Sequence, residues 1–417
     1  MIVIVYPQYH GVGGIARYLE SLLAHLPEGS PPIALITGRA PAASGAGAER
    51  HERAERDERT ERAEAIRSTP GPKPRRDVEV IELPLGTFPG ALWAWTWRAR
   101  RTLRQLRLRG PISAVNLHLP PLVSVLTVAG GSLGGAALVV TSHSNFAGLS
   151  GRLDAASGER RFPSAWGPLS LALRLRVERW IFSRADTVIC LTSQARQELA
   201  SYGRRDRIVV IPNGVDTERF SPRAPTAPAP DLDVLFAGRL EPLKGTRALP
   251  AVCARLVGAD PGVRIGIAGG GEDEAWLRQV LAPLAPQVQW LGRVPMSDMT
   301  ALYRRARVYA STSYYEGLPG TCLEAMACAL PVVVWDRGFY RGLVVDEQTG
   351  RLAPVDDAEA MAARIRALLQ DPARAASLGR RARQWVQHRY HWERLAREVV
   401  DACQRPLPHA ALVEVAP

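Results

Sequence analysis

The regular alternation of short apolar runs with longer helical stretches constrains the fold of this chain more than any other feature. The apolar runs are rich in Val and Ile, and repeated strand–helix units of this kind form parallel sheets with helices on both faces. In the first half we predict strands at Ile2–Tyr6, Ile33–Thr37, Val78–Leu83, Ser113–Leu117, Ala137–Thr141, Thr187–Leu191 and Ile208–Ile211. In the second half we predict strands at Val234–Ala237, Arg264–Ala268, Val288–Leu291, Val308–Ser311, Val332–Val334 and Arg351–Pro354.

A tract of prolines and alanines, Ser221–Pro230, divides the chain because it cannot continue a helix or a central strand. The length of 417 residues accommodates two domains. We therefore predict a doubly wound domain over residues 1–225, a second over residues 226–385, and a final helix with tail over residues 386–417. Residues 49–76 carry seven acids and nine bases with almost no large apolar residue, which is typical of a solvated insertion.

Two apolar stretches could be mistaken for targeting or membrane segments. The run within MIVIVY is shorter than the ~7–15 residues of a secretion signal core, so we interpret it as a buried strand. The uncharged stretch Gly110–Gly151 is divided by Pro120, Pro121 and a glycine cluster into pieces shorter than the ~20 residues of a membrane helix. Five scattered cysteines without a C-x-x-C pair favour a reducing compartment. We therefore expect a cytoplasmic protein.

The formal net charge is +12, and residues 83–153 contain seven arginines and no acid. Trp93, Trp95 and Trp97 directly precede six arginines that end at Arg109. Tryptophan beside arginine on an amphipathic helix is typical of proteins that lie on lipid headgroups, so one hypothesis is that Trp93–Arg109 docks on an anionic membrane. The alternative is a covering helix whose aromatic residues pack on the sheet. The charge also suits nucleic acid, but the sequence contains no recognition motif for it, and we expect no nucleic-acid partner.

A glycine-rich loop after the first strand, Gly11-Val-Gly13-Gly14, suggests close approach of backbone to a ligand phosphate at a helix N-terminus. It also satisfies the dinucleotide fingerprint G-x-G-x-x-A. The second strand lacks the acid that holds the ribose of NAD and ends near Arg39, which suits a 2′-phosphate. An NADP-dependent enzyme therefore stays open as an alternative.

Two further loops follow strands of the second domain. Gly238, Arg239, Lys244 and Gly245 combine two cations with two glycines, a pattern suited to holding a diphosphate. The alternative for Arg239 and Lys244 is a pair of solvated surface cations. The loop 269–271 consists of three glycines followed by three acids, which disfavour phosphate, so we expect it to turn tightly or to lie near an uncharged part of a ligand.

The most informative segment runs from Glu316 to Glu324. Pro319 and Gly320 end a loop, and the spacing predicts a helix that starts near Thr321 and offers unpaired N–H groups to an anion. Carboxylates on either side suit sugar hydroxyls, because a carboxylate only accepts hydrogen bonds. Glu316 has no capping role, so only ligand binding is expected of it. For Glu324 a second interpretation exists, since Thr321 and Glu324 have the spacing of a capping box.

Other types of catalytic site find no support in the sequence. There is no Ser-His-Asp order, no H-E-x-x-H and no P-loop. Asp231 and Asp233 resemble a metal-binding pair, but they stand at the start of a strand, whereas sites on such sheets gather at strand C-terminal ends. We therefore expect no metal and no cofactor.

Together these residues resemble the retaining glycosyltransferases of family 4, over nearly the whole chain outside residues 49–76. The resemblance rests on Gly13-Gly14, Ile211–Asp216, the Gly238–Gly245 loop, and Glu316-x7-Glu324 with its continuation to Val333. It implies the GT-B fold, in which two Rossmann-like doubly wound domains face each other across a cleft. Ala329 departs from the family, which usually has Gly before x-Pro-Val, and Pro319 replaces a common Gly.

The resemblance also implies roles for individual residues. A UDP- or GDP-sugar is the implied donor, with its diphosphate on Arg239 and Lys244, its sugar on Glu316 and its ribose on Glu324. His143 matches a histidine that approaches the sugar. The implied donor site has the residues Gly13, Gly14, Gly238, Arg239, Lys244, Glu316, Gly317, Leu318, Pro319, Gly320, Thr321 and Glu324.

We therefore expect a metal-independent enzyme that moves a sugar, with retention, to a glycan or lipid-linked acceptor. The final helix near Trp392–Cys403 is expected to cross back onto the first domain. A non-catalytic sugar-nucleotide-binding protein on the same scaffold stays open as the main alternative.

Overall fold

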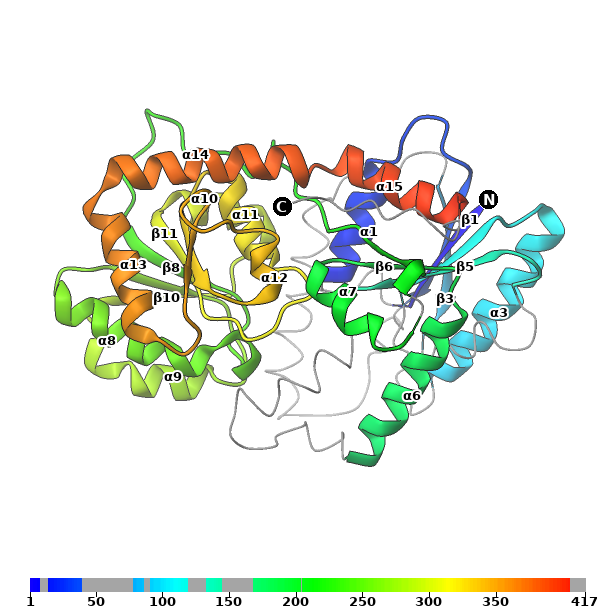
Figure 1. The fold of residues 1–417 in the computed structure, drawn as a ribbon, viewed down its shortest axis with the longest axis horizontal. Helices are drawn as coiled ribbons and strands as arrows, with labels where there is room; N and C mark the ends of the chain where they lie inside the picture. Colours follow the sequence, from blue (N-terminus) through cyan, green and yellow to red (C-terminus); the bar gives the residue numbers. More distant parts are fainter. Residues whose placement is uncertain are drawn as a thin grey trace, which may run out of the picture.

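The computed structural model describes residues 1–7, 14–39, 78–85, 91–118, 133–144, 168–203 and 205–405. Two sheets form the centres of two lobes, which Figure 1 shows side by side. Neighbouring strands run parallel throughout both sheets. This arrangement is the GT-B architecture, and it confirms the predicted α/β class.

The first sheet has the strand order β3-β2-β1-β4-β5-β6-β7. Its strands are β1 (Ile2–Tyr6), β2 (Ile33–Arg39), β3 (Val78–Pro84), β4 (Ala114–Leu117), β5 (Ala137–Ser142), β6 (Thr187–Cys190) and β7 (Ile208–Val210). Its helices are α1 (Gly14–Ala24), α3 (Ala91–Arg109), α6 (Pro168–Arg184) and α7 (Ser193–Ala200), with the 3-10 turn η2 (Arg205–Arg207). Alternate residues of β1 enter separate cores, Ile2 and Ile4 on one face and Val3 and Val5 on the other. Burial on both faces explains the continuous apolar runs.

The second sheet has the order β10-β9-β8-β11-β12-β13. Its strands are β8 (Leu232–Ala237), β9 (Ile265–Ala268), β10 (Val288–Gly292), β11 (Ala306–Ser311), β12 (Val332–Trp335) and β13 (Arg351–Ala353). Its helices are α8 (Leu249–Ala259), α9 (Glu274–Val280), α10 (Met299–Arg304), α11 (Gly320–Ala327), α12 (Gly338–Arg341), α13 (Ala358–Gln370) and α14 (Pro372–Arg389). The 3-10 turns are η3 (Pro242–Lys244), η4 (Thr246–Ala248), η5 (Ala282–Leu284) and η6 (Met296–Asp298). Every predicted strand is present, with ends within two residues of the prediction.

The last helix, α15 (Trp392–Gln404), belongs to the first lobe although it follows α14 of the second. Figure 1 shows α14 extending along the second lobe and α15 continuing over the first. Trp392, Leu395 and Val399 are buried in the same core as Ile2 and Tyr18. A side chain at Gly214 would lie 2.7 Å from the Trp392 ring, so the chain passes close to this helix where it leaves the first sheet. The predicted return of the final helix is confirmed, while the exact bounds of the predicted domains stay a prediction.

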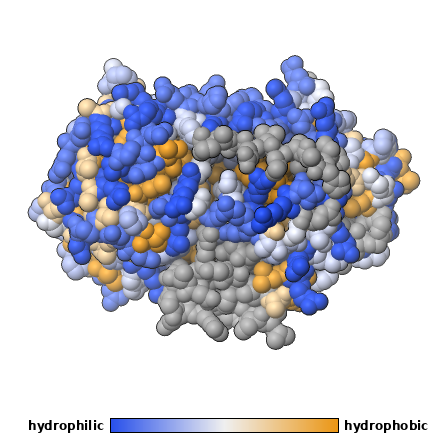
Figure 2. All heavy atoms as spheres, in the orientation of Figure 1, coloured by the Kyte–Doolittle hydropathy of each residue, from blue (hydrophilic) through white to orange (hydrophobic). Residues whose placement is uncertain are grey.

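The surface matches the charged composition. Figure 2 shows that hydrophilic side chains cover most of the face seen in that orientation, with smaller hydrophobic areas between them. No helix in the described ranges is long and apolar enough to span a membrane. The predicted insertion at residues 49–76 and the loop containing Gly13 lie outside the described residues.

The departure at Ala329 has a structural consequence. Ala329 follows α11 with a φ of 56°, in the left-handed region that favours glycine. Its N–H donates to the carbonyl of Met326, and the N–H of Leu330 donates to that of Ala325, which is the hydrogen-bond pattern of a Schellman motif. A Cβ at Gly379 of α14 would lie 2.0 Å from the Ala329 carbonyl oxygen, so the two segments are in close contact. Pro319, with a φ of −75°, is unstrained.

We expect Ala329→Gly to raise the free energy of unfolding by about 0.5–1 kcal/mol. Relief of the left-handed conformation contributes about 1–2 kcal/mol, and the greater entropy of glycine in the unfolded chain offsets part of it. Urea unfolding measures the change. Ala327→Gly, inside the same helix, is the matched control and should destabilise by about 1 kcal/mol. If the Ala329→Gly protein were no more stable than the original, the claim that Ala329 is strained would be wrong.

Candidate functional site

Gly245 fixes the position of the predicted diphosphate-binding residue Lys244. Its φ is +68°, and a Cβ there would lie 1.8 Å from the carbonyl oxygen of Thr312, so only glycine fits. The Thr312 hydroxyl donates to the Gly245 carbonyl at 3.0 Å, and the N–H of Tyr314 donates to the Leu243 carbonyl at 2.9 Å. The turn carrying Lys244 is thereby fixed against the segment that follows β11.

Lys244 and Glu316 form an ion pair, although 72 residues separate them in the sequence. Their side chains are only 19% and 13% exposed, so the pair is largely shielded from solvent. The other oxygen of Glu316 accepts a hydrogen bond from the Ser313 hydroxyl at 2.9 Å. The expectation that Glu316 serves only to bind a ligand is therefore wrong, because its carboxylate also neutralises Lys244. Lys244 has three N–H donors, so the pair still leaves donors for a second anion.

Arg239 lies at the carboxyl end of β8, and its guanidinium donates to Glu241 at 2.8 Å. The Arg239 side chain is 70% exposed, in contrast to Lys244. Burial raises the pKa of the Glu241 carboxyl, and the positive charges of Arg239 and Lys244 offset part of that rise. Glu241 thus lies within the electrostatic reach of both cations, a role that sequence reasoning missed. Its place three residues before Lys244 was the available signal.

The three-glycine loop packs on this strand end. A Cβ at Gly269 would lie 1.8 Å from the carbonyl oxygen of Gly238, and one at Gly271 would lie 2.2 Å from that of Leu240. The N–H of Gly238 donates to Ala268, and the N–H of Leu240 donates to Gly270. These glycines let the ends of two strands approach each other beside Arg239. The expectation that residues 269–271 turn tightly or lie near an uncharged part of a ligand stays a prediction.

Helix α11 begins at Gly320, one residue before the predicted start, and Pro319 occupies the N-cap position. No side chain caps this helix end. The Thr321 hydroxyl instead pairs with the Tyr309 hydroxyl at 2.8 Å, and Leu318 packs against the core beneath. The capping-box interpretation of Thr321 and Glu324 is therefore wrong, because Thr321 lies inside the first turn and Glu324 beyond it. The uncapped N–H groups are suited to an anion.

Glu324 is half-buried, and its carboxylate accepts a hydrogen bond from the Tyr303 hydroxyl at 2.8 Å. Burial raises the pKa of Glu324, while the Tyr303 hydroxyl and the positive charges of Arg17 and Arg219 offset part of the rise. Arg17 belongs to α1 of the first lobe, so the charge environment of Glu324 includes both lobes. Sequence reasoning missed Tyr303 and Arg17. A single Tyr or Arg on an amphipathic helix carried no signal of this contact.

The raised pKa of Glu324 predicts opposite effects of Glu324→Gln on stability and on nucleotide binding. A folded-state pKa above the unfolded value means that stability falls as pH rises through it, and the cost persists at neutral pH. Glu324→Gln should therefore raise the melting temperature of the ligand-free protein at pH 7. If the carboxylate accepts ribose hydroxyls, the same change weakens nucleotide binding by ~1–2 kcal/mol. Thermal melting and nucleotide titration measure the two effects, and nucleotide affinity equal to wild type would contradict a ribose role.

His143 lies at the contact between the lobes. It follows β5 of the first sheet, and a Cβ at Gly317 of the second lobe would lie 1.9 Å from its carbonyl oxygen. The loop that carries Glu316 therefore lies directly against His143. Gly317 lets the two backbones approach this closely. The predicted residues His143, Glu316 and Gly317 come together in space as the resemblance implies.

His143 is half-buried and contacts the buried side chains of His118 and Tyr18. Its Nε2 is 2.9 Å from Nδ1 of His118, which follows the adjacent strand β4. The Tyr18 ring packs edge-on against His143, with ring centres 4.8 Å apart. Burial lowers the pKa of His143 to about 3 and that of His118 below its ordinary value, so both imidazoles are neutral near pH 7. His118 could have been found from sequence, because neighbouring parallel strands end at the same sheet edge.

The remaining predictions concern other residues. Gly14 is the first residue of α1. Arg39 is 71% exposed and pairs with Glu82, an acid that reduces its suitability for a 2′-phosphate. Asp231 pairs with Arg305, and Asp233 pairs with both Arg264 and Arg307, which accounts for these acids without a metal. Within the ranges described above, no group of three or more His, Cys, Asp or Glu residues could hold a metal ion.

Comparison with protein families matches two parts of the chain. Residues 12–219 match the family described as Glycosyltransferase Family 4, and residues 217–385 match the one described as Glycosyl transferases group 1. The boundary between the matches falls between β7 and β8, where the chain passes from the first sheet to the second.

Individual relatives agree with these matches. Alpha-maltose-1-phosphate synthase of Mycolicibacterium smegmatis is 30% identical in an alignment of 311 positions that covers 64% of this chain and 78% of the relative. Glycogen synthase of Mycobacterium tuberculosis (strain CDC 1551 / Oshkosh) is 31% identical over 60% of this chain, and the chain spans 64% of that relative's length. The solved structure of Anabaena HepE in complex with UDP and glucose has a TM-score of 0.67 at 16% identity, covering 96% of this chain and 98% of HepE.

Proposed function

Since this chain belongs to the family 4 glycosyltransferases of the GT-B fold, we propose that it transfers a sugar from a nucleotide-diphosphate sugar to an acceptor hydroxyl. The observation that carries the proposal is the shielded Lys244–Glu316 pair, next to Gly317, whose backbone lies against the His143 carbonyl of the other lobe. A cation for a diphosphate and a carboxylate for sugar hydroxyls are thereby adjacent. UDP and GDP are the candidate nucleotides, and HepE, which has the same fold, was solved with UDP and glucose.

Each residue then has a role that its surroundings support. Lys244 and the uncapped N-terminus of α11 hold the diphosphate, with Arg239 at the exposed side. Glu316 accepts hydrogen bonds from hydroxyls of the donor sugar, and Glu324 accepts them from the ribose. The backbone at Gly14 and Gly238 lines the phosphates.

Catalysis in this proposal is chiefly electrostatic. The cation and the helix N-terminus stabilise the negative charge that develops on the departing diphosphate. The sugar is transferred with retention, and the leaving phosphate takes the proton of the acceptor hydroxyl. His143 is neutral and acts as a hydrogen-bonding group toward the sugar, since burial keeps its pKa at about 3. The reaction needs no metal and no cofactor.

A donor screen tests the proposal. Thermal melting with UDP, GDP, ADP and their sugars should raise the melting temperature for one nucleotide series, because ~100 times the dissociation constant adds ~2.7 kcal/mol. The matching sugar nucleotide should then be hydrolysed slowly or transferred to a glycan or lipid-linked acceptor. Binding of a nucleotide sugar with neither hydrolysis nor transfer to any acceptor would favour the non-catalytic alternative.

We further propose that α3 places a cytoplasmic enzyme on an anionic membrane, near a lipid-linked acceptor. Trp93 and Trp97 are 54% and 68% exposed, and Leu108 is 89% exposed at the other end of the helix. Trp95, in contrast, is fully buried and its indole N–H donates to the Thr37 carbonyl, so it packs on the sheet. Positions 93, 97, 101, 104 and 108 follow helical spacing, which gives one face with arginines between apolar side chains.

Liposome flotation should therefore show binding that rises with anionic lipid and falls with salt, because surface charges are screened over ~8–10 Å. Trp93→Ala with Trp97→Ala should lower the bound fraction, while Trp276→Ala, an exposed tryptophan of the second lobe, should leave it unchanged. Equal binding to neutral and anionic vesicles would contradict membrane docking through α3.

A further inference from the structure

A cavity lies in the lobe that carries Glu324, at the amino-terminal ends of β11 and β12. The proposed donor residues lie at the opposite, carboxyl-terminal edge of the same sheet. The cavity has a volume of about 390 Å³ and is formed by the chain between the two sheets, the ends of α10 and α11, and helices α13 and α14. This volume lies in the usual range of small-molecule sites.

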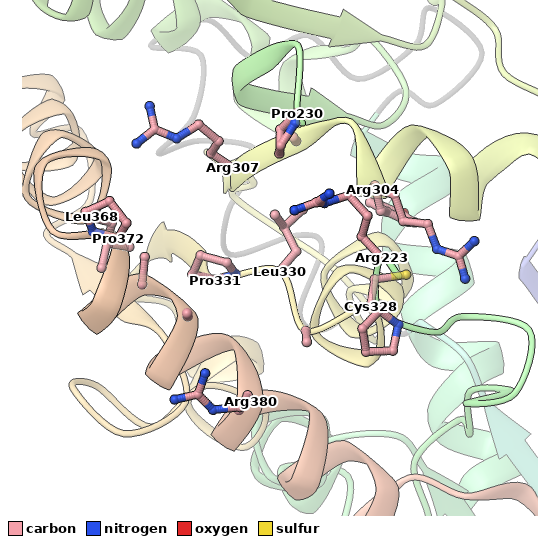
Figure 3. Close-up of a pocket in the computed structure, with 16 residues that line it drawn as sticks. Arg223, Pro230, Arg304, Arg307, Cys328, Leu330, Pro331, Leu368, Pro372 and Arg380 are labelled. Atoms are coloured by element: carbon pink, nitrogen blue, oxygen red, sulfur yellow. The ribbon is translucent and has the colours of Figure 1, made fainter. Parts of the chain in front are cut away.

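Four arginines and no acid line this cavity. Figure 3 shows Arg223, Arg304, Arg307 and Arg380 spread around an apolar centre that contains Leu330 and Pro331. They come from three parts of the chain, because Arg304 and Arg307 are neighbours at the end of α10 and the start of β11, whereas Arg223 and Arg380 are distant in sequence.

Three of these arginines have no carboxylate partner in the described part of the chain. Arg304 donates to the carbonyl and hydroxyl of Ser221, and Arg223 donates to the carbonyls of Ala227 and Pro228. For Arg380 no hydrogen bond or ion pair is found among the described residues. Only Arg307 is neutralised, by Asp233, which it shares with Arg264. Guanidinium groups without carboxylates around an apolar floor suit a phosphate attached to a carbon skeleton.

The cavity is connected to the proposed ribose site through one side chain. Tyr303 lines the cavity, and its hydroxyl donates to the Glu324 carboxylate at 2.8 Å. Helix α11 makes a second connection, because its N-terminus faces the donor side and Cys328 and Ala329 beyond its C-terminus line the cavity. A ligand that restrains Tyr303 would keep Glu324 oriented for ribose hydroxyls. Nucleotide binding would then lose less entropy in fixing the Glu324 side chain.

We propose that this cavity binds a small phosphorylated metabolite and that its occupancy strengthens nucleotide binding through Tyr303 and Glu324. The coupling rests on the proposed function of Glu324, whereas the phosphate site stands without it. The two statements are therefore tested separately.

Calorimetric titration with inorganic pyrophosphate tests the site. The double substitution Arg223→Gln with Arg380→Gln, here called the cavity variant, removes two exposed cations of the cavity. It should bind one molecule of pyrophosphate fewer per protein than wild type. Arg255→Gln with Arg278→Gln removes two exposed arginines elsewhere on the same lobe and should bind like wild type. Lys244→Gln changes the donor site, and this variant should still bind one molecule of pyrophosphate in the cavity. Equal stoichiometry in wild type and cavity variant, or no binding to wild type at millimolar pyrophosphate, overturns the proposal.

Titration with UDP in the presence of pyrophosphate tests the coupling. The cavity variant measures competition at the donor site alone, so any additional effect in wild type comes from the cavity. We expect wild type to bind UDP at least about fivefold more tightly than the cavity variant under these conditions. Tyr303→Phe should still bind pyrophosphate in the cavity, but its affinity for UDP should be as low as that of the cavity variant. Identical UDP affinities in wild type and cavity variant overturn the coupling, while the first titration still decides the site if no nucleotide binds.

Discussion

Replacing Lys244 by Ala should lower sugar transfer by about 100-fold or more, because the change removes a charge-assisted contact to the departing diphosphate. The shielding of Lys244, at 19% exposure, makes this contact stronger than one at the surface. Arg239→Ala should cost only about 10-fold, since a side chain that is 70% exposed is screened by water. Initial rates with the donor found in the screen measure both.

Arg255→Ala is the matched control for these variants. Arg255 also forms an ion pair in the second lobe, with Glu359, but both of its members are 58% exposed and lie on α8 and α13, far from the donor side of the sheet. Its loss should leave transfer unchanged. Wild-type transfer should also survive EDTA, because cations and helix N–H groups stabilise the leaving group. A requirement for added Mn²⁺ or Mg²⁺ would contradict this assignment of Lys244.

The fold followed from sequence because its strands are buried on both faces. In β1 and β8 every position except the last of β8 is buried, so β1 is an uninterrupted apolar run and β8 is apolar apart from Asp233. Strand β3 lies at the edge of the first sheet, and its residues are half-buried or exposed. It was nevertheless predicted, because Val78, Val80 and Ile81 keep β-favouring side chains at that edge.

The site was predictable only where chemistry is concentrated in short segments. Lys244 and Glu316 each lie beside glycines in loops after strands, so the sequence marks them. Tyr303 and His118 approach the site from other elements, and their contacts depend on how helices and strands pack. The capping-box prediction failed for a related reason. Tyr309 of the neighbouring strand holds the Thr321 hydroxyl, and a local spacing carries no trace of such a tertiary contact.

Glu316→Gln should abolish most transfer, by about 100-fold or more, and should also destabilise the protein. An amide cannot match an ionised acceptor for sugar hydroxyls, and it leaves the shielded Lys244 ammonium without its counter-charge. We expect the loss of stability to be about 1–2 kcal/mol, the usual cost of an unsatisfied buried partner. Rates and urea unfolding measure the two effects.

A second substitution separates the two roles of Glu316. Lys244→Met combined with Glu316→Gln removes both charges, so it should recover most of the lost stability, because no unpaired ion is then left in a shielded position. Transfer should stay as low as in the single variants, since donor contacts are still missing. Glu359→Gln breaks the exposed pair with Arg255 and serves as the control, with little effect on either measurement. If Glu316→Gln kept wild-type transfer, the ion pair would be a structural feature and Glu316 would have no role toward the sugar.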